Sequence, residues 1–179
     1  MISNDIKKVL ISSSQIEEVC KKLGQQIKND YKDKQLIIIG LLKGCLPFMS
    51  DIIKNIDDYV LIDYMDVSSY SGKESTGKVK ILKDIEIDVT NKDVIIIDDI
   101  VDTGTTLSNI INLFKERNVK SIEACCLLNK PLNRTCDVNV KYFGFDIPNE
   151  FVVGYGLDYN ELYRNLPYIA TLKECIYKK

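Results

Sequence analysis

Residues 94–107, Val-Ile-Ile-Ile-Asp-Asp-Ile-Val-Asp-Thr-Gly-Thr-Thr-Leu, change physical character three times and decide the fold of the chain. The β-branched run 94–97 has no polar alternation, which predicts a strand buried on both faces of a parallel sheet. Asp98 and Asp99 follow where that strand should leave the sheet, and ligands bind at the carboxyl ends of strands in open α/β sheets. From Leu107 onward, apolar residues recur at helical spacing. The stretch therefore predicts a strand, a loop and a helix, with a site in the loop.

The loop itself, residues 102–106, is rich in hydroxyls and small side chains. Free backbone N–H groups, threonine hydroxyls and the helix dipole all favour a phosphate at such a helix start, and Gly104 lets the backbone approach it closely. Taken separately, two acids after a strand are usually solvated turn residues, and Asp-Thr-Gly is often only an N-cap. Acids beside a phosphate cradle on one loop instead describe a sugar-phosphate site.

Composition limits the possible functions of the chain. Its 179 residues and 45% hydrophobic content are enough for one domain with a sizeable core. A net charge of -2 gives no electrostatic reason to expect nucleic acid or an acidic membrane as a partner. No apolar run approaches the roughly twenty residues needed to span a bilayer, and residues 1–5 lack the features of a signal peptide. We therefore expect a cytoplasmic protein.

The chain contains no histidine, so imidazole acid–base chemistry and histidine metal sites are excluded. Proton transfer must fall to a carboxylate, lysine, tyrosine or cysteine. The cysteines lack Cys-x-x-Cys spacing, and most lie in apolar segments, which favours structural thiols. They are Cys20, Cys45, Cys125, Cys126, Cys136 and Cys175.

Periodicity predicts the other elements. Residues 14–17, Ser-Gln-Ile-Glu, match a capping box and predict a helix to about Asp30. A second helix should follow with Pro47 in its first turn. Strands are predicted at residues 35–41, 60–65, 79–82, 121–128 and 138–143.

Two lysines come directly after predicted core strands. Lys43 lies between Gly40 and Gly44, and Lys130 follows the strand at 121–128. Each alone is more often a solvated turn residue than a ligand. Both lysines, like Asp98, come at the ends of predicted core strands, which places them in line with one another. Lys43 with its neighbouring N–H groups could therefore hold a pyrophosphate.

Residues 68–78 form a polar stretch in which mobility is expected. Within it, 72–78 match most of a P-loop, but Val79 stands where Ser or Thr should coordinate magnesium, so we reject that interpretation. Residues 144–161 are rich in glycine and aromatic side chains, with a packed β-turn as the simpler alternative.

From about Leu36 to Leu166, these motifs in this order resemble the type I phosphoribosyltransferases, in the hypoxanthine-guanine branch. Residues 94–107 resemble the signature loop for phosphoribosyl pyrophosphate (PRPP), and 42–44 resemble the pyrophosphate loop, which implies a cis peptide between Leu42 and Lys43. Ser-Tyr at 69–70 looks like the catalytic lid, and residues 151–161 resemble the base pocket. The sequence departs from the family at two positions. Asp98 replaces the more usual glutamate of the acidic pair, and Ser71 stands where glycine commonly follows the lid tyrosine.

The resemblance implies an α/β fold with a central, mainly parallel twisted sheet flanked by helices. It also implies a small hood built from the terminal regions. We expect a single domain, 1–179, with a core at about 35–145. The hood should comprise N-terminal residues and about 146–179, and the assembly should be a homodimer or homotetramer.

The implied reaction displaces pyrophosphate from PRPP by a nitrogen of a 6-oxopurine, hypoxanthine or guanine, with Mg2+ as cofactor. Asp102 would accept the proton near N7 of the base, beneath a lid carrying Ser69 and Tyr70. Lys130 would pair with the 6-oxo group, and Phe151 would stack on the purine. The other implied contacts are Lys43, Gly44 and Arg164 for the pyrophosphate; Asp98 and Asp99 for ribose hydroxyls, directly or through metal; Thr103, Gly104, Thr105 and Thr106 for the 5'-phosphate; the Val152 backbone for the base edge; and Asp158, in the base pocket, for a second magnesium.

Two alternatives remain open from the residues. A ligand-sensing regulator on the same fold would keep the phosphate loop but lack the lid and show a basic face. A phosphoribosyltransferase for a pyrimidine or adenine would share most of the motifs. Lys130 and the sequence Phe-Val-Val-Gly at 151–154 favour a 6-oxopurine.

Overall fold

The computed structural model describes residues 2–69 and 79–177. Its main sheet, within those residues, has six strands in the order β4-β3-β2-β5-β6-β7. Strand β4 is antiparallel to β3, and the other neighbours are parallel. The strands are β2 (Leu36–Leu42), β3 (Val60–Ser69), β4 (Val79–Lys83), β5 (Asp93–Val101), β6 (Ser121–Asn129) and β7 (Tyr142–Asp146). This is the mainly parallel sheet that the sequence predicts.

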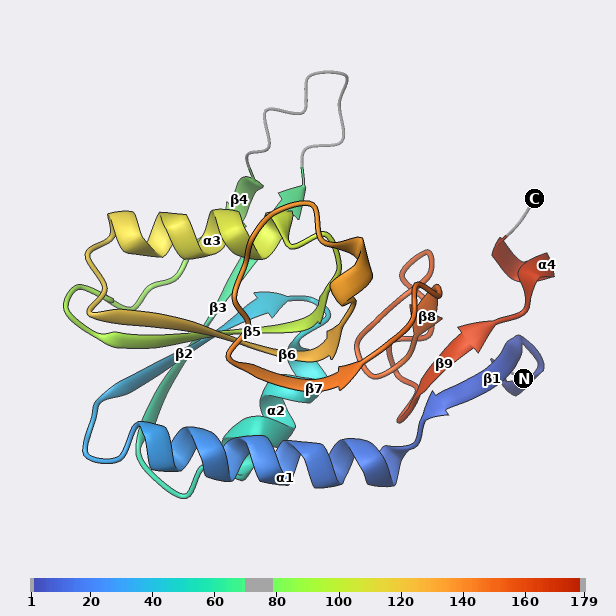
Figure 1. Ribbon diagram of the computed structural model, residues 1–179, viewed down its shortest axis with the longest axis horizontal. Coiled ribbons are helices and arrows are strands. Elements are labelled where there is room, and N and C mark those ends of the chain that lie inside the picture. The colour runs from blue at the N-terminus through green and yellow to red at the C-terminus, as the bar shows by residue number, and fades with distance from the viewer. Residues whose placement is uncertain (1, 70–78, 178–179) are drawn as a thin grey trace.

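Helices cover both faces of the sheet (Figure 1). Helices α1 (Ser13–Asp30) and α2 (Leu46–Lys54) lie on one face, and α3 (Thr105–Glu116) lies on the other. Alternate residues of the central strands feed the two cores: Ile95 and Ile97 pack on the α1–α2 side, whereas Ile96 packs on the α3 side. A strand buried on both faces needs apolar residues at every position, which is why residues 94–97 show no alternation.

The strand order reverses between β2 and β5. From β2 the chain crosses through α2 to β3 on one side, and from β5 it crosses through α3 to β6 on the other. The loops after β2 and β5 therefore lie on either side of this reversal at the carboxyl edge of the sheet, which is the usual ligand position in doubly wound folds.

A second, antiparallel sheet lies beside the first and joins the two ends of the chain (Figure 1). Its central strand is β9 (Ile169–Leu172), flanked by β1 (Ile6–Ile11) and β8 (Val152–Val153). Periodicity did not predict these strands, although a hood from the terminal regions was expected. The remaining short elements are η1 (Ile2–Asn4), η2 (Pro131–Asn133) and α4 (Glu174–Tyr177).

Two local predictions were wrong. The capping box of α1 is formed by Ser12 and Gln15, each side chain bonding to the other's backbone N–H, so the helix begins before Ser14. The strand predicted at 138–143 is β7, which begins only at Tyr142, because parallel pairing with β6 starts at the contact of Cys125 with Tyr142.

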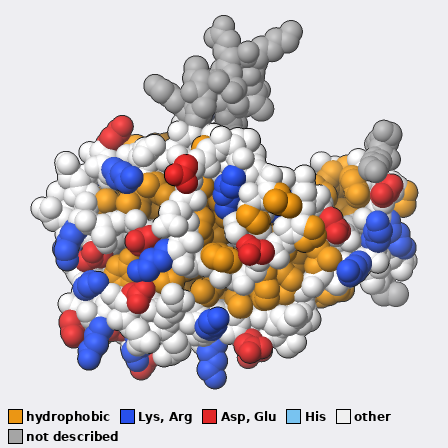
Figure 2. Space-filling model, in the orientation of Figure 1, with side chains coloured by type: hydrophobic (Ala, Val, Ile, Leu, Met, Phe, Trp, Pro, Cys, Tyr) orange, Lys and Arg blue, Asp and Glu red, His pale blue; other side chains and the backbone are white. Residues whose placement is uncertain are grey.

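The surface shown in Figure 2 intersperses Lys and Arg with Asp and Glu side chains, without a single-sign stripe on that face. This agrees with the near-neutral balance of the sequence. Of the helices in residues 2–69 and 79–177, none combines the length and apolar character needed to cross a membrane.

Candidate active site

The acidic pair lies at the carboxyl edge of the sheet, where the strand order reverses between β2 and β5. Pairing of β5 with β2 ends at Ile97, whereas pairing with β6 continues to Val101. Strand β5 thus runs on through Asp98 and Asp99 rather than ending before them. Burial raises the pKa of both carboxyls; the charge of Asp99 adds to the effect at Asp98, and nearby Arg164 opposes it at Asp99. Such a pair is stabilised in its charged form by a cation or by hydroxyl donors.

The loop after β2 packs directly on this pair. The peptide between Leu42 and Lys43 is cis, as the resemblance implies. At Gly44 an added Cβ would lie 1.7 Å from Oδ2 of Asp99, so any side chain there would displace the Asp99 carboxylate, and glycine allows this close approach. On its other side, Gly156 has φ of +103° and its added Cβ would lie 2.0 Å from the carbonyl oxygen of Gly44. Two glycines thus bring three separate segments together.

The loop after β5 opens helix α3 as a phosphate cradle would. Gly104 takes the N-cap position with φ of +85° and has no side chain to cap the helix; Thr103 Oγ1 accepts a long hydrogen bond, 3.4 Å, from the N–H of Thr105, the first helical residue. An added Cβ there would also lie 2.6 Å from Val138. The hydroxyl of Thr103 donates to that of Thr105. A hollow of about 130 Å³ is lined by Asp98, Ile100, Val101, Asp102, Thr103, Gly104, Thr106 and Leu107.

Asp102 is held from the loop after β6. Lys130 Nζ lies 3.4 Å from its Oδ2, and Asn133 Nδ2 donates to its Oδ1 at 2.8 Å. The Lys130 side chain is only 9% exposed, whereas that of Asp102 is 45% exposed. The structure therefore brings Asp102, the predicted proton acceptor, into contact with Lys130, the residue predicted to select the purine. The Asp102 carboxylate remains accessible to a ligand.

Asn133 and Arg134 were missed by sequence reasoning. Arg134 donates to the backbone carbonyls of Val101 and Asp102, so it fixes the start of the loop after β5, which is predicted to bind phosphate. The same Asn133 amide that binds Asp102 also donates to Asn149 Oδ1 at 2.7 Å. Neither residue lies in a periodic segment or a motif, so no local pattern identified them.

Phe151 and Val152 enter the site from the small sheet. Val152 pairs with Thr171 in β9, and Phe151 is 44% exposed. The Phe151 ring contacts Tyr159 edge-on, with centroids 5.8 Å apart, and lies tilted against Tyr177 at 5.6 Å. An exposed ring backed by aromatic neighbours can stack on a planar ligand. Tyr177 was not singled out from the sequence.

Arg164 and Asp158 form an ion pair at 2.9 Å, next to the Lys43 loop. Arg164 Nη1 also donates to the carbonyl of Gly156, while its buried Nε has no acceptor among the described residues. Glu161 belongs to the stretch 151–161 expected to form the base pocket, but no contact with the pyrophosphate ligands was predicted for it; it lies 3.1 Å from Lys43 Nζ and 3.3 Å from Arg164 Nη2. Hydrogen bonds from Lys43 and then Arg164 lower the pKa of Glu161.

The remaining predicted residues belong to the lid. Ser69 is the last residue of β3 and pairs with Val79 of β4. Tyr70 and the rest of the predicted lid to residue 78 lie outside the described residues.

The carboxylates at two places, the Asp98–Asp99 pair and Asp158, could bind a metal ion if a bound ligand supplied further oxygen ligands. Across residues 2–69 and 79–177, no group of three or more Cys, Asp or Glu side chains is arranged to hold a metal alone. The Asp98–Asp99 pair and Asp158 supply one or two carboxylates each. Magnesium is commonly held this way, by one or two carboxylates together with substrate phosphates.

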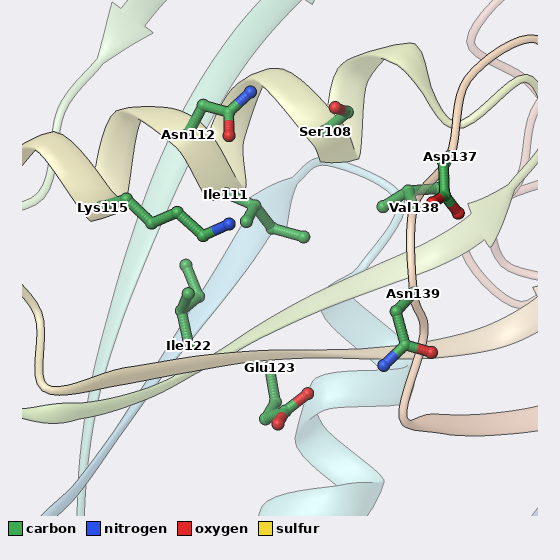
Figure 3. Close-up of a pocket in the computed structure, with 9 residues that line it drawn as sticks. All are labelled: Ser108, Ile111, Asn112, Lys115, Ile122, Glu123, Asp137, Val138 and Asn139. Atoms are coloured by element: carbon green, nitrogen blue, oxygen red, sulfur yellow. The ribbon is translucent and has the colours of Figure 1, made fainter.

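A different hollow, of about 310 Å³, opens beside α3 (Figure 3). None of its residues is a predicted site residue, and it is separate from the carboxyl-edge hollow. It is lined by Ser108, Ile111, Asn112, Lys115, Ile122, Glu123, Asp137, Val138 and Asn139.

Comparisons with known proteins agree with this geometry. Residues 12–160 match the family model of the phosphoribosyl transferase domain. The chain is 56% identical over 176 residues to the hypoxanthine-guanine phosphoribosyltransferase of Staphylococcus epidermidis, covering 98% of each chain. A crystal structure of a hypoxanthine phosphoribosyltransferase from Staphylococcus aureus superposes with a TM-score of 0.96 at 54% identity, covering 99% of this chain and 97% of that one. A hypoxanthine-guanine phosphoribosyltransferase from Bacillus anthracis gives 0.89 at 43% identity, covering 94% and 98%.

Proposed function

The chain belongs to the hypoxanthine-guanine phosphoribosyltransferase family, and we propose that it carries out the family's reaction with the residues gathered at the carboxyl edge of its sheet. The reaction transfers the 5-phosphoribosyl group of PRPP to a 6-oxopurine and releases pyrophosphate, a step of purine salvage. The family predicted from the sequence is thereby confirmed. The observation that carries the residue assignment is the meeting of the 43–44 loop, the acidic pair and the 156–164 segment through Gly44 and Gly156.

PRPP would lie across the carboxyl edge of the sheet. The first-turn N–H groups of α3 and the hydroxyls of Thr103, Thr105 and Thr106 would hold its 5'-phosphate. Lys43 and Arg164 would face the pyrophosphate, while Asp98 and Asp99 would take the ribose hydroxyls or a metal. Bound Mg2+, held by the acidic pair and by Asp158 together with the substrate, would supply cationic charge to the departing pyrophosphate.

The base would lie between this loop and the small sheet. Phe151 would stack on the purine and the Val152 backbone would read its edge. Lys130, nearly buried, would donate to the 6-oxo group. Asp102 would accept the proton released as the purine nitrogen bonds to carbon 1, since its carboxylate is accessible and the chain has no histidine.

Ser69 and Tyr70 keep their proposed catalytic role in a lid that excludes water from the reacting carbon. We further propose a single domain, 1–179, with the small sheet as its hood, working as a homodimer or homotetramer. Six free cysteines fit a reducing compartment and support a cytoplasmic location.

The test is pyrophosphate release from PRPP with hypoxanthine, guanine, xanthine, adenine and a pyrimidine supplied in turn. We expect release with hypoxanthine and guanine in the presence of Mg2+, and none with adenine or the pyrimidine. A ligand-sensing regulator would bind PRPP without releasing pyrophosphate, and that result would contradict the proposal.

A further inference from the structure

One carboxylate oxygen contacts both cations that we assign to the pyrophosphate. Glu161 Oε2 lies 3.1 Å from Lys43 Nζ and 3.3 Å from Arg164 Nη2. The two cations come from segments far apart in the sequence, one after β2 and the other near the C-terminal end of the chain. Glu161 thus supplies negative charge where the proposed function requires the substrate to supply it.

The position of Glu161 is built by the backbone and not by packing of its side chain. Asn160 and Glu161 both have left-handed φ angles, 53° and 63°, which residues other than glycine adopt uncommonly. The turn is fixed by the bond from the Glu161 N–H to Asp158 Oδ2 at 2.9 Å. The side chain itself is 63% exposed. The fold accepts an unfavourable backbone here and directs an exposed carboxylate toward two cations.

Arg164 does not need Glu161 to hold its place. Its guanidinium already contacts Asp158 at 2.9 Å and the Gly156 carbonyl at 2.7 Å. The contact with Glu161 is longer than either. Removing the Glu161 charge should therefore leave Arg164 in position. It should also release Arg164 Nη2 and Lys43 Nζ from their contacts with the Glu161 carboxylate.

We propose that Glu161 is a tethered competitor of the pyrophosphate group. Its carboxylate neutralises Lys43 and Arg164 in the empty site, yields them to PRPP, and returns to them as pyrophosphate leaves. A single carboxylate carries less charge than pyrophosphate, so the substrate displaces it, yet its local presence lowers the affinity for both polyanions. The chain thereby weakens product binding without changing the groups that carry out the transfer. This inference rests on the proposed function of Lys43 and Arg164.

The test is the variant Glu161→Gln, which keeps the shape of the side chain and removes its charge. We expect PRPP and pyrophosphate, each with Mg2+, to bind about 3- to 10-fold more tightly, because exposed ion pairs have modest energies. The Michaelis constant for hypoxanthine should not change. The gain should shrink as salt is added. Glu116→Gln, an exposed charge change on α3, serves as the matched control and should match the parent protein.

A double-mutant cycle, together with the single variants of the two cations, distinguishes a failure of the Glu161 inference from a failure of the proposed pyrophosphate site. In a Lys43→Gln background, Glu161→Gln should lose part of its effect, since one of the two competing contacts is gone. If Glu161→Gln leaves binding unchanged or weakens it while Lys43→Gln and Arg164→Gln weaken it, this inference is wrong and the proposed function stands. If neither cation variant alters pyrophosphate or PRPP affinity, the assignment of the pyrophosphate site itself is wrong.

Discussion

The ammonium nitrogen of Lys130 lies 3.4 Å from Oδ2 of Asp102. The residue proposed to select the base and the residue proposed to take its proton are thus adjacent, one nearly buried and the other accessible. A purine that accepts a hydrogen bond from Lys130 through its 6-oxo group would have N7 on the same side of the ring, toward Asp102. Selection and proton transfer are therefore two consequences of one placement of the base.

Replacing Lys130 by Ala should raise the Michaelis constant for hypoxanthine about 10- to 100-fold, because a hydrogen bond to a charged group in a desolvated site is lost. The preference over adenine should narrow, since the ammonium no longer opposes the 6-amino group. Steady-state kinetics with both bases measure this change. The Michaelis constant for PRPP is the internal control, and its selective increase would make Lys130 a phosphate ligand.

The variant Asp102→Asn should lower kcat about 10²- to 10⁴-fold, because an amide keeps the shape but cannot accept the proton. PRPP affinity, measured by calorimetry, should change little. Asp137→Asn, an exposed change in the segment after η2, is the matched control. Equal losses in turnover and in PRPP affinity would reassign Asp102 to binding.

Activity should require a divalent cation, because two acidic clusters face a polyanionic substrate. Excess chelator should abolish turnover, and Mg2+ should restore it. As a readout independent of activity, PRPP should raise the melting temperature of the protein more with Mg2+ than without it. Full turnover in chelator would contradict the prediction.

Tyr177→Ala should raise the Michaelis constant for hypoxanthine about 3- to 10-fold, since an aromatic contact that orients Phe151 is lost. Tyr177→Phe keeps the ring and should behave as the parent protein. Cys175→Ser, an exposed change on the same helix α4, is the control. An equal increase for PRPP would show a general disturbance of the hood instead of a contact with the base site.

Stability at acid pH should depend on Asp30. The hydroxyl of Tyr142 donates to it at 2.7 Å and Lys141 pairs with it at 2.9 Å, which lowers its pKa below the usual 3.8. Because the folded pKa is lowered, the stabilisation is complete above the unfolded pKa and disappears as pH falls through the folded one. Asp30→Asn should therefore cost about 1 kcal/mol at pH 7, a value reduced by partial exposure, and almost nothing near pH 2. Urea unfolding at both pH values measures the difference; an equal cost at both would exclude the charge as its source.

The sequence predicts the main sheet well because each central strand is buried on both faces. Such a strand, like residues 94–97, is continuous in apolar residues and needs no information from distant parts of the chain. The small sheet is different. Among the residues that the structure describes, strand β1 pairs with β9 alone, more than 150 residues away, and Ile6–Ile11 has no regular alternation that would identify it. Its existence depends on tertiary pairing and not on a local pattern.

The site shows the same division. Lys43, Asp98, Asp99 and the 102–106 loop were predicted because they follow the buried apolar stretches of core strands, whose carboxyl ends meet at one edge. Asn133 was not predicted, and Glu161 was expected only within the base-pocket stretch, because their contacts cross the fold, to Asp102 and to Lys43 respectively. A side chain in an irregular segment gives no sign in the sequence of which distant group it will reach.

The pairing of β1 with β9 has a consequence for how the protein is made. Strand β9 is the central strand of the small sheet, and within residues 2–69 and 79–177 it follows all the other strands in the sequence. Until residues 169–172 emerge, neither β1 nor Val152 of β8 has its partner. The loops after β2 and β5, which we propose hold the sugar phosphate, are synthesised well before that point. The small sheet that carries Phe151 and Val152, the proposed base contacts, can therefore form only after β9 has been synthesised.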